Sequence, residues 1–261
     1  MVNTHLAVLG SPIEHSKSPL IHPAAYAALG LEWDYGRYRI EAAELSSFLK
    51  LRDSNWRGFS LTMPLKEVAF ELSVPSCPVA SETGIVNTLL QTELGWEGYN
   101  TDSFGIQQAV RKHSSNVYDN ITVLGSGATA RSAVHAARQI NPNSTLQIFS
   151  RSRVDIDGVS SLPLEDFYSS AISGLTISTL PGTVTHSSLE VSEDAVILDV
   201  AYSPWPSKLA SAWGVQNRIS GIEMLLWQAL IQVRIFYAGD GSVELPNETE
   251  VFKSMRASVQ A

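Results

Sequence analysis

The sequence has little of three things whose scarcity restricts its function: cysteine, positive charge and long uninterrupted apolar runs. Cys77 is the single cysteine in 261 residues, so no disulfide can form within the chain and no cluster of thiolates can hold a metal. The 18 Lys and Arg residues are outnumbered by 26 Asp and Glu residues. The resulting net charge of −8 argues against nucleic acid or an anionic membrane as the main partner. Scarce cysteine suits the reducing cytoplasm, where we expect this chain.

The longest apolar stretch is not expected to cross a membrane. It covers residues 221–238 and contains Glu223, Gln228, Gln232 and Arg234. The first residues have no basic region, and their apolar run is too short for a secretory signal. With 44% hydrophobic and 17% charged residues, the composition predicts a soluble globular protein of one large domain or two of ~100–150 residues.

Strand-like and helix-like patterns alternate along the chain, which predicts an α/β fold with parallel sheet. Strands are expected at 6–9, 35–40, 58–62, 120–124, 145–149, 175–178 and 195–199. Helices are expected at 23–29, with Pro23 in the first turn, and at 41–51, 67–72, 128–140 and 222–238. A second strand–helix series begins near residues 102–104, so we place a domain boundary there. The last helix is expected to return to the first domain.

A glycine-rich turn follows the strand expected at 120–124. Residues 125–130 read Gly-Ser-Gly-Ala-Thr-Ala and fit the pattern G-x-G-x-x-[G/A]. The first glycine suits a tight turn, the second lets a pyrophosphate approach the backbone, and Ala130 allows close helix–strand packing. N–H groups at the start of the helix would bind the phosphates. The pattern predicts a dinucleotide site, against the alternative of a tight turn that binds nothing.

The end of the next strand carries two arginines. Residues 149–153 read Phe-Ser-Arg-Ser-Arg, where an NAD site usually has an acidic residue that binds the ribose 2′-hydroxyl. A guanidinium matches a phosphate in charge and in planar shape, so the sequence favours NADP over NAD. The alternative is that Arg151 and Arg153 are solvated surface charges.

Polar residues beside glycine and proline gather in four segments, at 10–19, 60–66, 84–88 and 98–105. Ligands of open α/β sheets bind at the carboxyl ends of strands, and this set of hydroxyl, amide, ammonium and carboxylate groups suits a small polyhydroxylated ligand. Taken singly, each group has an alternative role. The serines and asparagines could hold turns, Asp102 could cap a helix over 103–112, and Lys66 could be a surface lysine.

Taken together, the four segments and the glycine-rich turn resemble the shikimate dehydrogenase family. In chain order, the matching segments are G-S-P-I-E-H-S-K-S-P-L-I-H at 10–22, S-L-T-M-P-L-K at 60–66, G-I-V-N-T at 84–88, G-Y-N-T-D-S-F-G at 98–105, D-V-A-Y-S-P at 199–204 and G-I-E-M-L-L-W-Q-A at 221–229. They follow the order of the family over roughly residues 6–238, which makes the resemblance specific.

The resemblance implies a fold and a reaction. It implies a three-layer α/β substrate domain over 1–102, completed by C-terminal helices in 222–261, and a Rossmann NADP-binding domain over 103–221. The implied reaction is the reversible reduction of 3-dehydroshikimate to shikimate by NADPH, in chorismate and aromatic amino-acid biosynthesis. The implied protein is a cytoplasmic monomer or homodimer that uses no metal and binds neither nucleic acid nor membrane.

The resemblance also implies the site residues by position. Lys66 and Asp102 are the implied catalytic pair. Substrate binding is implied for Ser16, Ser18, Thr62, Asn87, Asp102, Tyr202 and Gln228. Cofactor binding is implied for Gly125, Ser126, Gly127, Ala128, Thr129, Ala130, Ser150, Arg151, Ser152, Thr179, Leu180, Val200, Gly221 and Met224.

The implied catalytic pair suits the reaction. When hydride reaches the carbonyl carbon, negative charge develops on its oxygen, which then needs a nearby proton donor or cation. Lys66 can supply both, and Asp102 can orient it. The sequence departs from the family at several places. Ser60 stands where Asn is common, and the segment between Arg151 and Ser178 is short, without a full helical pattern at 154–158.

Two other functions stay open on the sequence. A catabolic quinate/shikimate dehydrogenase would accept a 1-hydroxylated ring and prefer NAD, a preference that Arg151 argues against. A non-catalytic ligand sensor on the same fold would not need both Lys66 and Asp102, and their presence weighs against it.

Overall fold

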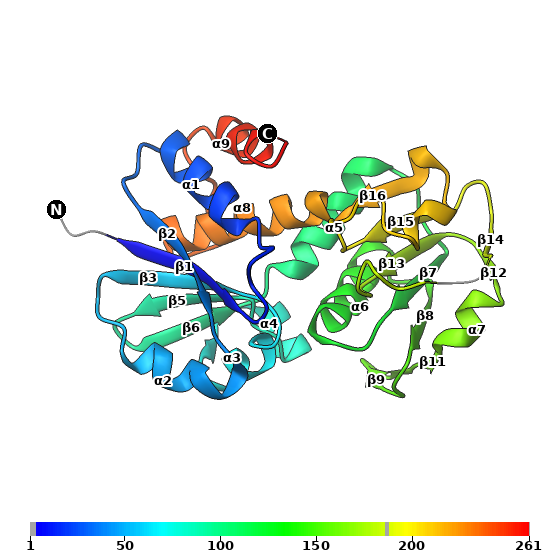
Figure 1. The fold of residues 1–261 in the computed structure, drawn as a ribbon, viewed down its shortest axis with the longest axis horizontal. Helices are drawn as coiled ribbons and strands as arrows, with labels where there is room; N and C mark the ends of the chain where they lie inside the picture. Colours follow the sequence, from blue (N-terminus) through cyan, green and yellow to red (C-terminus); the bar gives the residue numbers. More distant parts are fainter. Residues whose placement is uncertain (1–3, 186–187, 261) are drawn as a thin grey trace. The chain divides into compact units, whose positions relative to one another are not determined.

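The chain divides into two compact units in the structure, a computed structural model that describes residues 4–185 and 188–260. Unit 1 consists of Met1–Thr101 and Gln228–Ala261, and unit 2 of Asp102–Trp227. Each unit contains a six-stranded sheet with helices packed on it (Figure 1). Within the described ranges, no helix is both long and apolar enough to span a membrane.

The sheet of unit 1 has the strand order β2-β1-β3-β5-β6-β4. Its strands are β1 (His5–Gly10), β2 (Asp34–Arg39), β3 (Trp56–Leu61), β4 (Val74–Pro75), β5 (Thr88–Thr92) and β6 (Gly95–Tyr99). β2, β1 and β3 are parallel, but β5 is antiparallel to both β3 and β6. Only Glu93 and Leu94 join β5 to β6, and so short a connection requires antiparallel strands. The parallel arrangement expected from the sequence therefore does not extend to β5.

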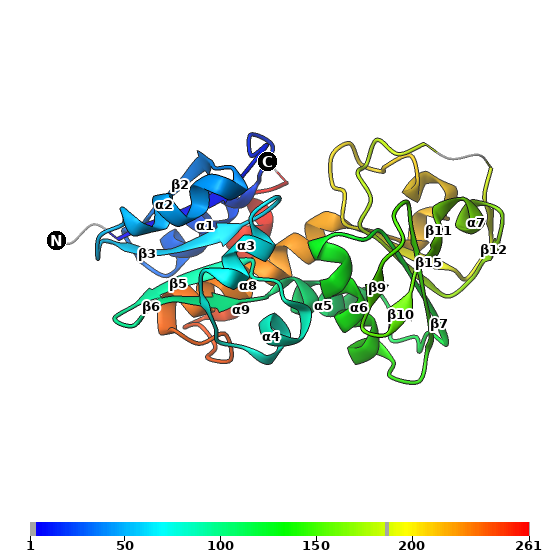
Figure 2. The ribbon, with the colours of Figure 1, turned by 90° about the horizontal axis from the view of Figure 1, so that it is seen from below.

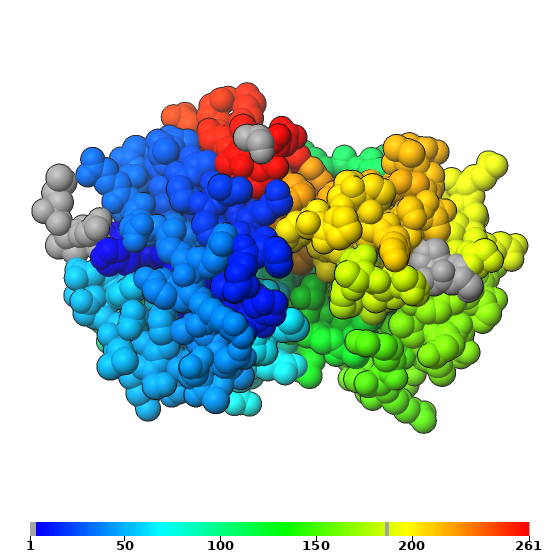
Figure 3. Space-filling model, viewed as in Figure 1, coloured from blue at the N-terminus to red at the C-terminus, as the bar shows by residue number. Residues whose placement is uncertain are grey.

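Helices cover both faces of this sheet. They are α1 (Ser18–Ala28), α2 (Leu45–Lys50) after the short helix η1 (Ala42–Glu44), α3 (Lys66–Glu71), α4 (Pro78–Thr83), α8 (Gly221–Ala238) and α9 (Glu248–Ala257). Within unit 1, α1, α9 and the part of α8 from Gln228 onward lie on one face, and α2 and α3 on the other (Figures 1 and 2). In the space-filling view, the C-terminal residues in red lie against the N-terminal residues in blue, as the contacts between α9 and α1 require (Figure 3).

Alternate residues of β3 pack against the helices on the two faces of the unit 1 sheet. Phe59 and Leu61 belong to the apolar cluster that includes the residues of α2 and α3. Gly58 faces α8, where a Cβ would lie 2.6 Å from the ring of Phe236, so only glycine allows this helix to pack so closely. Ser60 shares the face of Gly58, which places a hydroxyl under α8.

Helix α1 begins five residues earlier than the sequence predicted. The prediction placed Pro23 in the first turn, but Pro19 holds that position and Pro23 lies inside the helix. Proline is favoured at the first helical position because its missing N–H has no partner there in any case. The signal at Pro19 was therefore the stronger one, and the helix tolerates the second proline one turn later.

The sheet of unit 2 is parallel throughout, with the order β11-β8-β7-β13-β15-β16. Its strands are β7 (Asn120–Leu124), β8 (Thr145–Ser150), β11 (Leu162–Pro163), β13 (Leu175–Ser178), β15 (Val196–Asp199) and β16 (Arg218–Ser220). Numbered along the chain, this order is 3-2-1-4-5-6, which is typical of dinucleotide-binding sheets. The four strands that the sequence predicted in this unit are confirmed, each within one residue at either end.

Helices α5 (Asp102–His113) and α6 (Ala128–Ile140) share one apolar cluster with this sheet, and α7 (Leu164–Tyr168) shares another. Two short strand pairs complete the unit, β9 (Asp155–Ile156) with β10 (Val159–Ser160), and β12 (Ala171–Ile172) with β14 (Glu190–Val191). Short helices η2 (Ala210–Ala212) and η3 (Val215–Asn217) precede β16. A hairpin thus stands at 154–158, where the sequence predicted no full helix. Asp157 and Gly158, with φ of 55° and 73°, form its turn.

Candidate active site

The ends of β1 and β3 bring two of the polar segments together in unit 1. Ser11 N donates to Met63 O at 2.9 Å, and Thr62 N donates to Leu9 O at 3.0 Å. A Cβ on Gly10 would lie 2.4 Å from Thr62 Cγ2, so glycine is needed for this close approach. Because β1 and β3 are parallel, both segments follow carboxyl ends, where ligands of α/β sheets bind.

These two segments carry Ser16, Ser18, Thr62 and Lys66. Ser18 is the first residue of α1, and its backbone N–H donates to Ser16 Oγ at 3.3 Å. Lys66 is the first residue of α3 and is only 9% exposed. Its carbonyl accepts a hydrogen bond from Val86 N at 3.0 Å, which ties it to the next polar segment. A lysine this deeply buried is not the surface lysine of the alternative interpretation.

The other two polar segments meet around Asn87. Its side-chain Nδ2 donates to Thr101 Oγ1 at 2.9 Å and to Gln228 Oε1 at 3.3 Å. Its Oδ1 accepts from Thr101 N at 3.0 Å. Asn87 and Gln228 are 1% and 7% exposed. Their hydrogen bond shows that the structure brings two predicted substrate residues together, although 141 positions separate them.

Asp102 directly follows Thr101 and begins α5, at the first residue of unit 2. It is 4% exposed. The bond from Thr101 N to Asn87 Oδ1 fixes the backbone at the preceding residue. The helix expected over 103–112 is present, with Asp102 as its first residue, where an acidic group is favoured by the helix dipole. A structural and a chemical role are compatible at this position.

Four buried residues connect to this cluster that the sequence did not single out as site residues: His22, Tyr35, Thr88 and Gln232. Tyr35 donates to Ser60 Oγ at 2.8 Å, and Ser60 donates to Gln232 Oε1 at 2.8 Å. Ser60, which departs from the family pattern, is thus an internal member of a hydrogen-bond chain. Burial raises the pKa of Tyr35, and it lowers the pKa of His22 from 6.5 to about 3, so both side chains are neutral.

In unit 2, the glycine-rich turn joins β7 to α6. β7 is paired with β13 in the sheet, and the strand order reverses at this pair. Gly125 has a φ of +123°, and a Cβ there would lie 2.2 Å from Thr179 Oγ1. Thr179 holds the adjoining loop in place, because its N and its Oγ1 donate to Leu124 O at 2.8 Å and 2.7 Å. Gly125, Thr179 and Leu180 are therefore neighbours at the carboxyl ends of two adjacent strands.

The residues of this turn fit a dinucleotide. A Cβ on Gly127 would meet no atom within 4 Å, so the turn is open where the second glycine of the pattern should admit a pyrophosphate. Helix α6 begins at Ala128, and the N–H groups at a helix start attract phosphate. Ala130 is fully buried, as close packing requires.

The other implied cofactor residues also follow carboxyl ends in unit 2. Ser150 ends β8, and its Oγ donates to Ser152 O at 2.6 Å, while Arg151 is exposed. Val200 follows β15, and Gly221 and Met224 lie in the first turn of α8 after β16. A Cβ on Gly221 would lie 2.2 Å from Val200 O, so glycine permits the contact between the two loops.

Asp199 fixes the loop that carries Tyr202. The carboxylate accepts hydrogen bonds from Ser207 Oγ and, at 3.1 Å, from Ala201 N. Burial raises the pKa of this carboxyl, and these bonds act in the opposite direction. The half-buried Tyr202 is therefore presented by a loop that is tied down on both sides.

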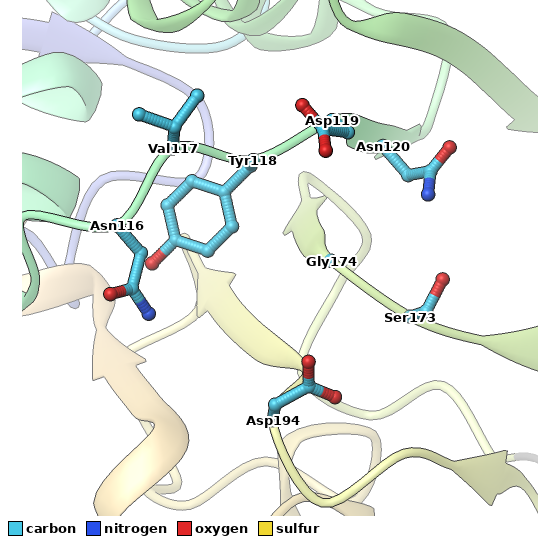
Figure 4. A pocket seen from close by; sticks show the side chains of 8 residues that line it. All are labelled: Asn116, Val117, Tyr118, Asp119, Asn120, Ser173, Gly174 and Asp194. Carbon is cyan, nitrogen blue, oxygen red and sulfur yellow. The ribbon is translucent and has the colours of Figure 1, made fainter.

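A separate hollow of about 320 Å³ in unit 2 is not the dinucleotide site. Figure 4 shows its lining residues, which include Tyr118, Asn120, Gly174 and Asp194. Asn120 begins β7 and Gly174 precedes β13, so the hollow lies at the amino ends of strands whose carboxyl ends hold the glycine-rich turn. Among the residues that the structure describes, no group of three or more His, Cys, Asp or Glu side chains is arranged to hold a metal ion.

Comparisons with known proteins agree on one family. The model of the shikimate dehydrogenase substrate binding domain matches residues 8–89. Two curated relatives named shikimate dehydrogenase (NADP(+)) match almost end to end. The Methanococcoides burtonii protein is 29% identical over 93% of this chain and 96% of its own length, and a Thermus thermophilus protein is 30% identical over 88% and 91%. The chain also matches the pentafunctional AROM polypeptide of Yarrowia lipolytica at 29% identity, but spans only 17% of that protein.

Solved structures give the same result. The shikimate dehydrogenase of Mycobacterium tuberculosis is 30% identical, with a TM-score of 0.75, and 98% of this chain covers 99% of that one. A Thermus thermophilus shikimate 5-dehydrogenase, solved in complex with NADP(H) and shikimate, is 26% identical with a TM-score of 0.80, over 98% of this chain and 99% of that one.

Proposed function

This chain belongs to the shikimate dehydrogenase family, and from that membership we propose that it catalyses the reversible reduction of 3-dehydroshikimate to shikimate by NADPH. The observation that carries the proposal is the likeness, along nearly the whole chain, to a protein solved with both NADP(H) and shikimate. The buried amide and hydroxyl groups around Asn87 are consistent with a polyhydroxylated substrate.

We assign substrate binding mainly to unit 1 and cofactor binding to unit 2; of the residues assigned to the substrate, Asp102 and Tyr202 belong to unit 2. The match of residues 8–89 to a substrate binding domain supports the first assignment. The sheet order of unit 2 and the open turn at Gly127 support the second. When bound, NADPH supplies the hydride, and NADP accepts it in the reverse direction.

Lys66 is the proposed proton donor to the carbonyl oxygen of 3-dehydroshikimate, and it takes the proton back during oxidation. An ammonium near that oxygen also stabilises the negative charge that develops as hydride arrives. Asp102 is the proposed partner that orients Lys66 and binds a substrate hydroxyl. The low exposure of each residue supports its role, because burial strengthens the electrostatic effect of a charged group.

The remaining side chains hold the substrate. We assign its carboxylate and hydroxyls to this set of side chains: Ser16, Ser18, Thr62, Asn87, Tyr202 and Gln228. Arg151 is assigned to the ribose 2′-phosphate of NADP, because its guanidinium follows β8 and is exposed. A cytoplasmic location and a monomeric or homodimeric state complete the proposal.

A spectrophotometric assay tests this function. Purified protein is given shikimate or quinate with NADP or NAD, and absorbance of the reduced nicotinamide is followed at about 340 nm. We expect the largest kcat/KM with shikimate and NADP. A larger value with quinate and NAD would favour the catabolic alternative, and no reduction with any pair would overturn the proposal.

A further inference from the structure

Helix α8 carries two buried glutamines one helical turn apart, and only the first belongs to the recognised pattern. Gln228 and Gln232 are 7% and 1% exposed, and a spacing of four places them on the same face of the helix. Gln228 bonds to Asn87 and Thr101, within the proposed substrate site. Gln232 lies one turn further along α8, and no part of the proposed mechanism uses it.

The side-chain amide of Gln232 makes four hydrogen bonds. Its Oε1 accepts from Ser60 Oγ at 2.8 Å and lies 3.2 Å from His22 Nε2. Its Nε2 donates to Asn87 O at 3.1 Å and to Thr88 Oγ1 at 2.9 Å. Two donors and two accepting lone pairs are all that a carboxamide offers, so the group is fully used.

The two groups next to Gln232 Oε1, Ser60 and His22, fix the orientation of the Gln232 amide. Tyr35 donates to Ser60, so the proton of Ser60 is left for Gln232 Oε1. His22 is fully buried, and burial lowers its pKa to about 3, which leaves a neutral ring with one N–H. Tyr26 Oη lies 3.3 Å from Nδ1 and can donate to it, so Nε2 carries the proton toward Gln232. Both groups therefore donate to Oε1.

The bonds that Gln232 Nε2 donates connect this orientation to the proposed substrate-binding amides of Asn87 and Gln228. Because Thr88 Oγ1 accepts from Gln232, its own proton points to Asn87 Oδ1, at 2.9 Å. This bond and the one from Thr101 N both make Asn87 Oδ1 an acceptor, so its Nδ2 must donate to Thr101 and Gln228. Gln228 Oε1, held by Asn87 and Thr101, is an acceptor in turn.

We propose that Gln232 is a positioning residue, which sets the orientation of the Asn87 and Gln228 side-chain amides toward the ring hydroxyls of the substrate. The inference rests on the proposed function. A carboxamide can rotate by half a turn with almost no change in shape, and only its hydrogen-bond partners distinguish the two orientations. Rotation of Gln232 would place its NH₂ against two donors and its oxygen against the carbonyl of Asn87, which a dry site penalises.

The test replaces Gln232 with methionine, which has a similar volume but none of the four bonds. Binding of shikimate and of NADP is measured separately by isothermal titration calorimetry. We expect the Kd of shikimate to rise roughly tenfold, as for the loss of about one well-placed hydrogen bond, while the Kd of NADP stays unchanged. Thr88→Val removes the two bonds of the Thr88 hydroxyl, to Gln232 Nε2 and to Asn87 Oδ1, but leaves the other three bonds of Gln232, so it should raise the Kd of shikimate by a smaller factor.

Arg234→Met is the matched control on the same helix. It breaks a largely buried ion pair with Glu248, whose Oε2 lies 2.6 Å from Arg234 Nε. It should lower the Tm and leave both Kd values unchanged, which separates a positioning effect from loss of stability.

An unchanged Kd of shikimate in Gln232→Met would overturn the inference, and so would an equal rise in both Kd values. If Gln232→Met does not fold, Thr88→Val decides by the same criteria. A wild-type protein that is active with shikimate and NADP while these variants bind normally leaves the proposed function intact and refutes only the role of Gln232. A wild-type protein that neither binds nor oxidises shikimate overturns both.

Discussion

Unit 1 and unit 2 hold their candidate ligand-binding groups by different means. In unit 1 the groups are side chains such as Asn87 and Gln228, fixed by a buried hydrogen-bond network between residues far apart in the sequence. In unit 2 they are mostly backbone groups, in a glycine-rich turn and at the start of α6. A polyhydroxylated ring needs several oriented donors and acceptors, whereas a phosphate is satisfied by N–H groups and positive charge. The difference between the two sites follows from the chemistry of the two proposed ligands.

The largest expected effect is on kcat when Lys66 of unit 1 is replaced, and cofactor binding in unit 2 should not change with it. Lys66→Met should lower kcat by about 10²–10⁴-fold, the contribution typical of a positioned proton donor. The Kd of NADP should not change, because Lys66 belongs to the other unit. Steady-state kinetics and calorimetry measure the two quantities. A kcat equal to that of the wild type would contradict the assigned role.

The next effect tests the claim that backbone conformation builds the site of unit 2. Gly125→Ala should lower the free energy of unfolding by about 1–3 kcal/mol, because φ is +123° and the added Cβ would lie 2.2 Å from Thr179 Oγ1. Gly127→Ala is the matched control, since a Cβ there meets nothing within 4 Å. It should cost about 1 kcal/mol or less in stability, yet weaken NADP binding. Urea unfolding that shows equal losses for both variants would argue against this account of the turn.

A smaller effect concerns Arg151, the side chain of unit 2 that is assigned to the ribose 2′-phosphate of NADP. Arg151→Ala should raise the KM for NADP about ten- to a hundredfold, as expected for a lost charge-assisted hydrogen bond, and leave the KM for NAD unchanged. Arg153→Ala, two residues further along, should have a weaker effect. If the KM values for NADP and NAD rise equally in Arg151→Ala, the arginine does not recognise the 2′-phosphate.

The smallest effect, when taken over a single pH unit, is a pH dependence of stability that belongs to unit 1. Burial lowers the pKa of His22 from 6.5 to about 3, so between these values the unfolded chain takes up a proton that the folded protein does not. The free energy of unfolding should therefore fall as the pH decreases below about 6.5, by up to about 1.4 kcal/mol per pH unit. In His22→Gln this contribution should be absent. Urea unfolding at several pH values compares the two proteins, and identical pH dependence would refute the assignment.

The sequence predicted unit 2 more completely than unit 1. The turn at 125–130 and its flanking strand and helix are local in the sequence, and each residue type has its own conformational reason. Sequence position alone therefore predicted a tight turn at Gly125 and close packing at Ala130, and the structure has both features. The antiparallel β5 was missed because its hairpin lacks the Asn-Gly or Asp-Gly signal of a two-residue turn.

The support of the unit 1 site could not be predicted in the same way. Gln232 reaches Asn87 across 145 positions, and nothing local indicates that pairing. One signal was available: Gln232 is a polar residue in an otherwise apolar helix, four positions after Gln228. This signal argued against a membrane span. It did not identify Ser60 and Thr88 as the partners of Gln232, because they lie on β3 and β5, which only the fold places beneath α8.

Transfer of label between the two ligands tests the central claim most directly, because a substrate assigned to unit 1 must receive hydride from a cofactor assigned to unit 2. The protein is incubated with 3-dehydroshikimate and NADPH that carries deuterium at both C4 positions of the nicotinamide, and the product is analysed by mass spectrometry. Our account predicts shikimate that carries one deuterium per molecule. Unlabelled shikimate, or no shikimate, would contradict it.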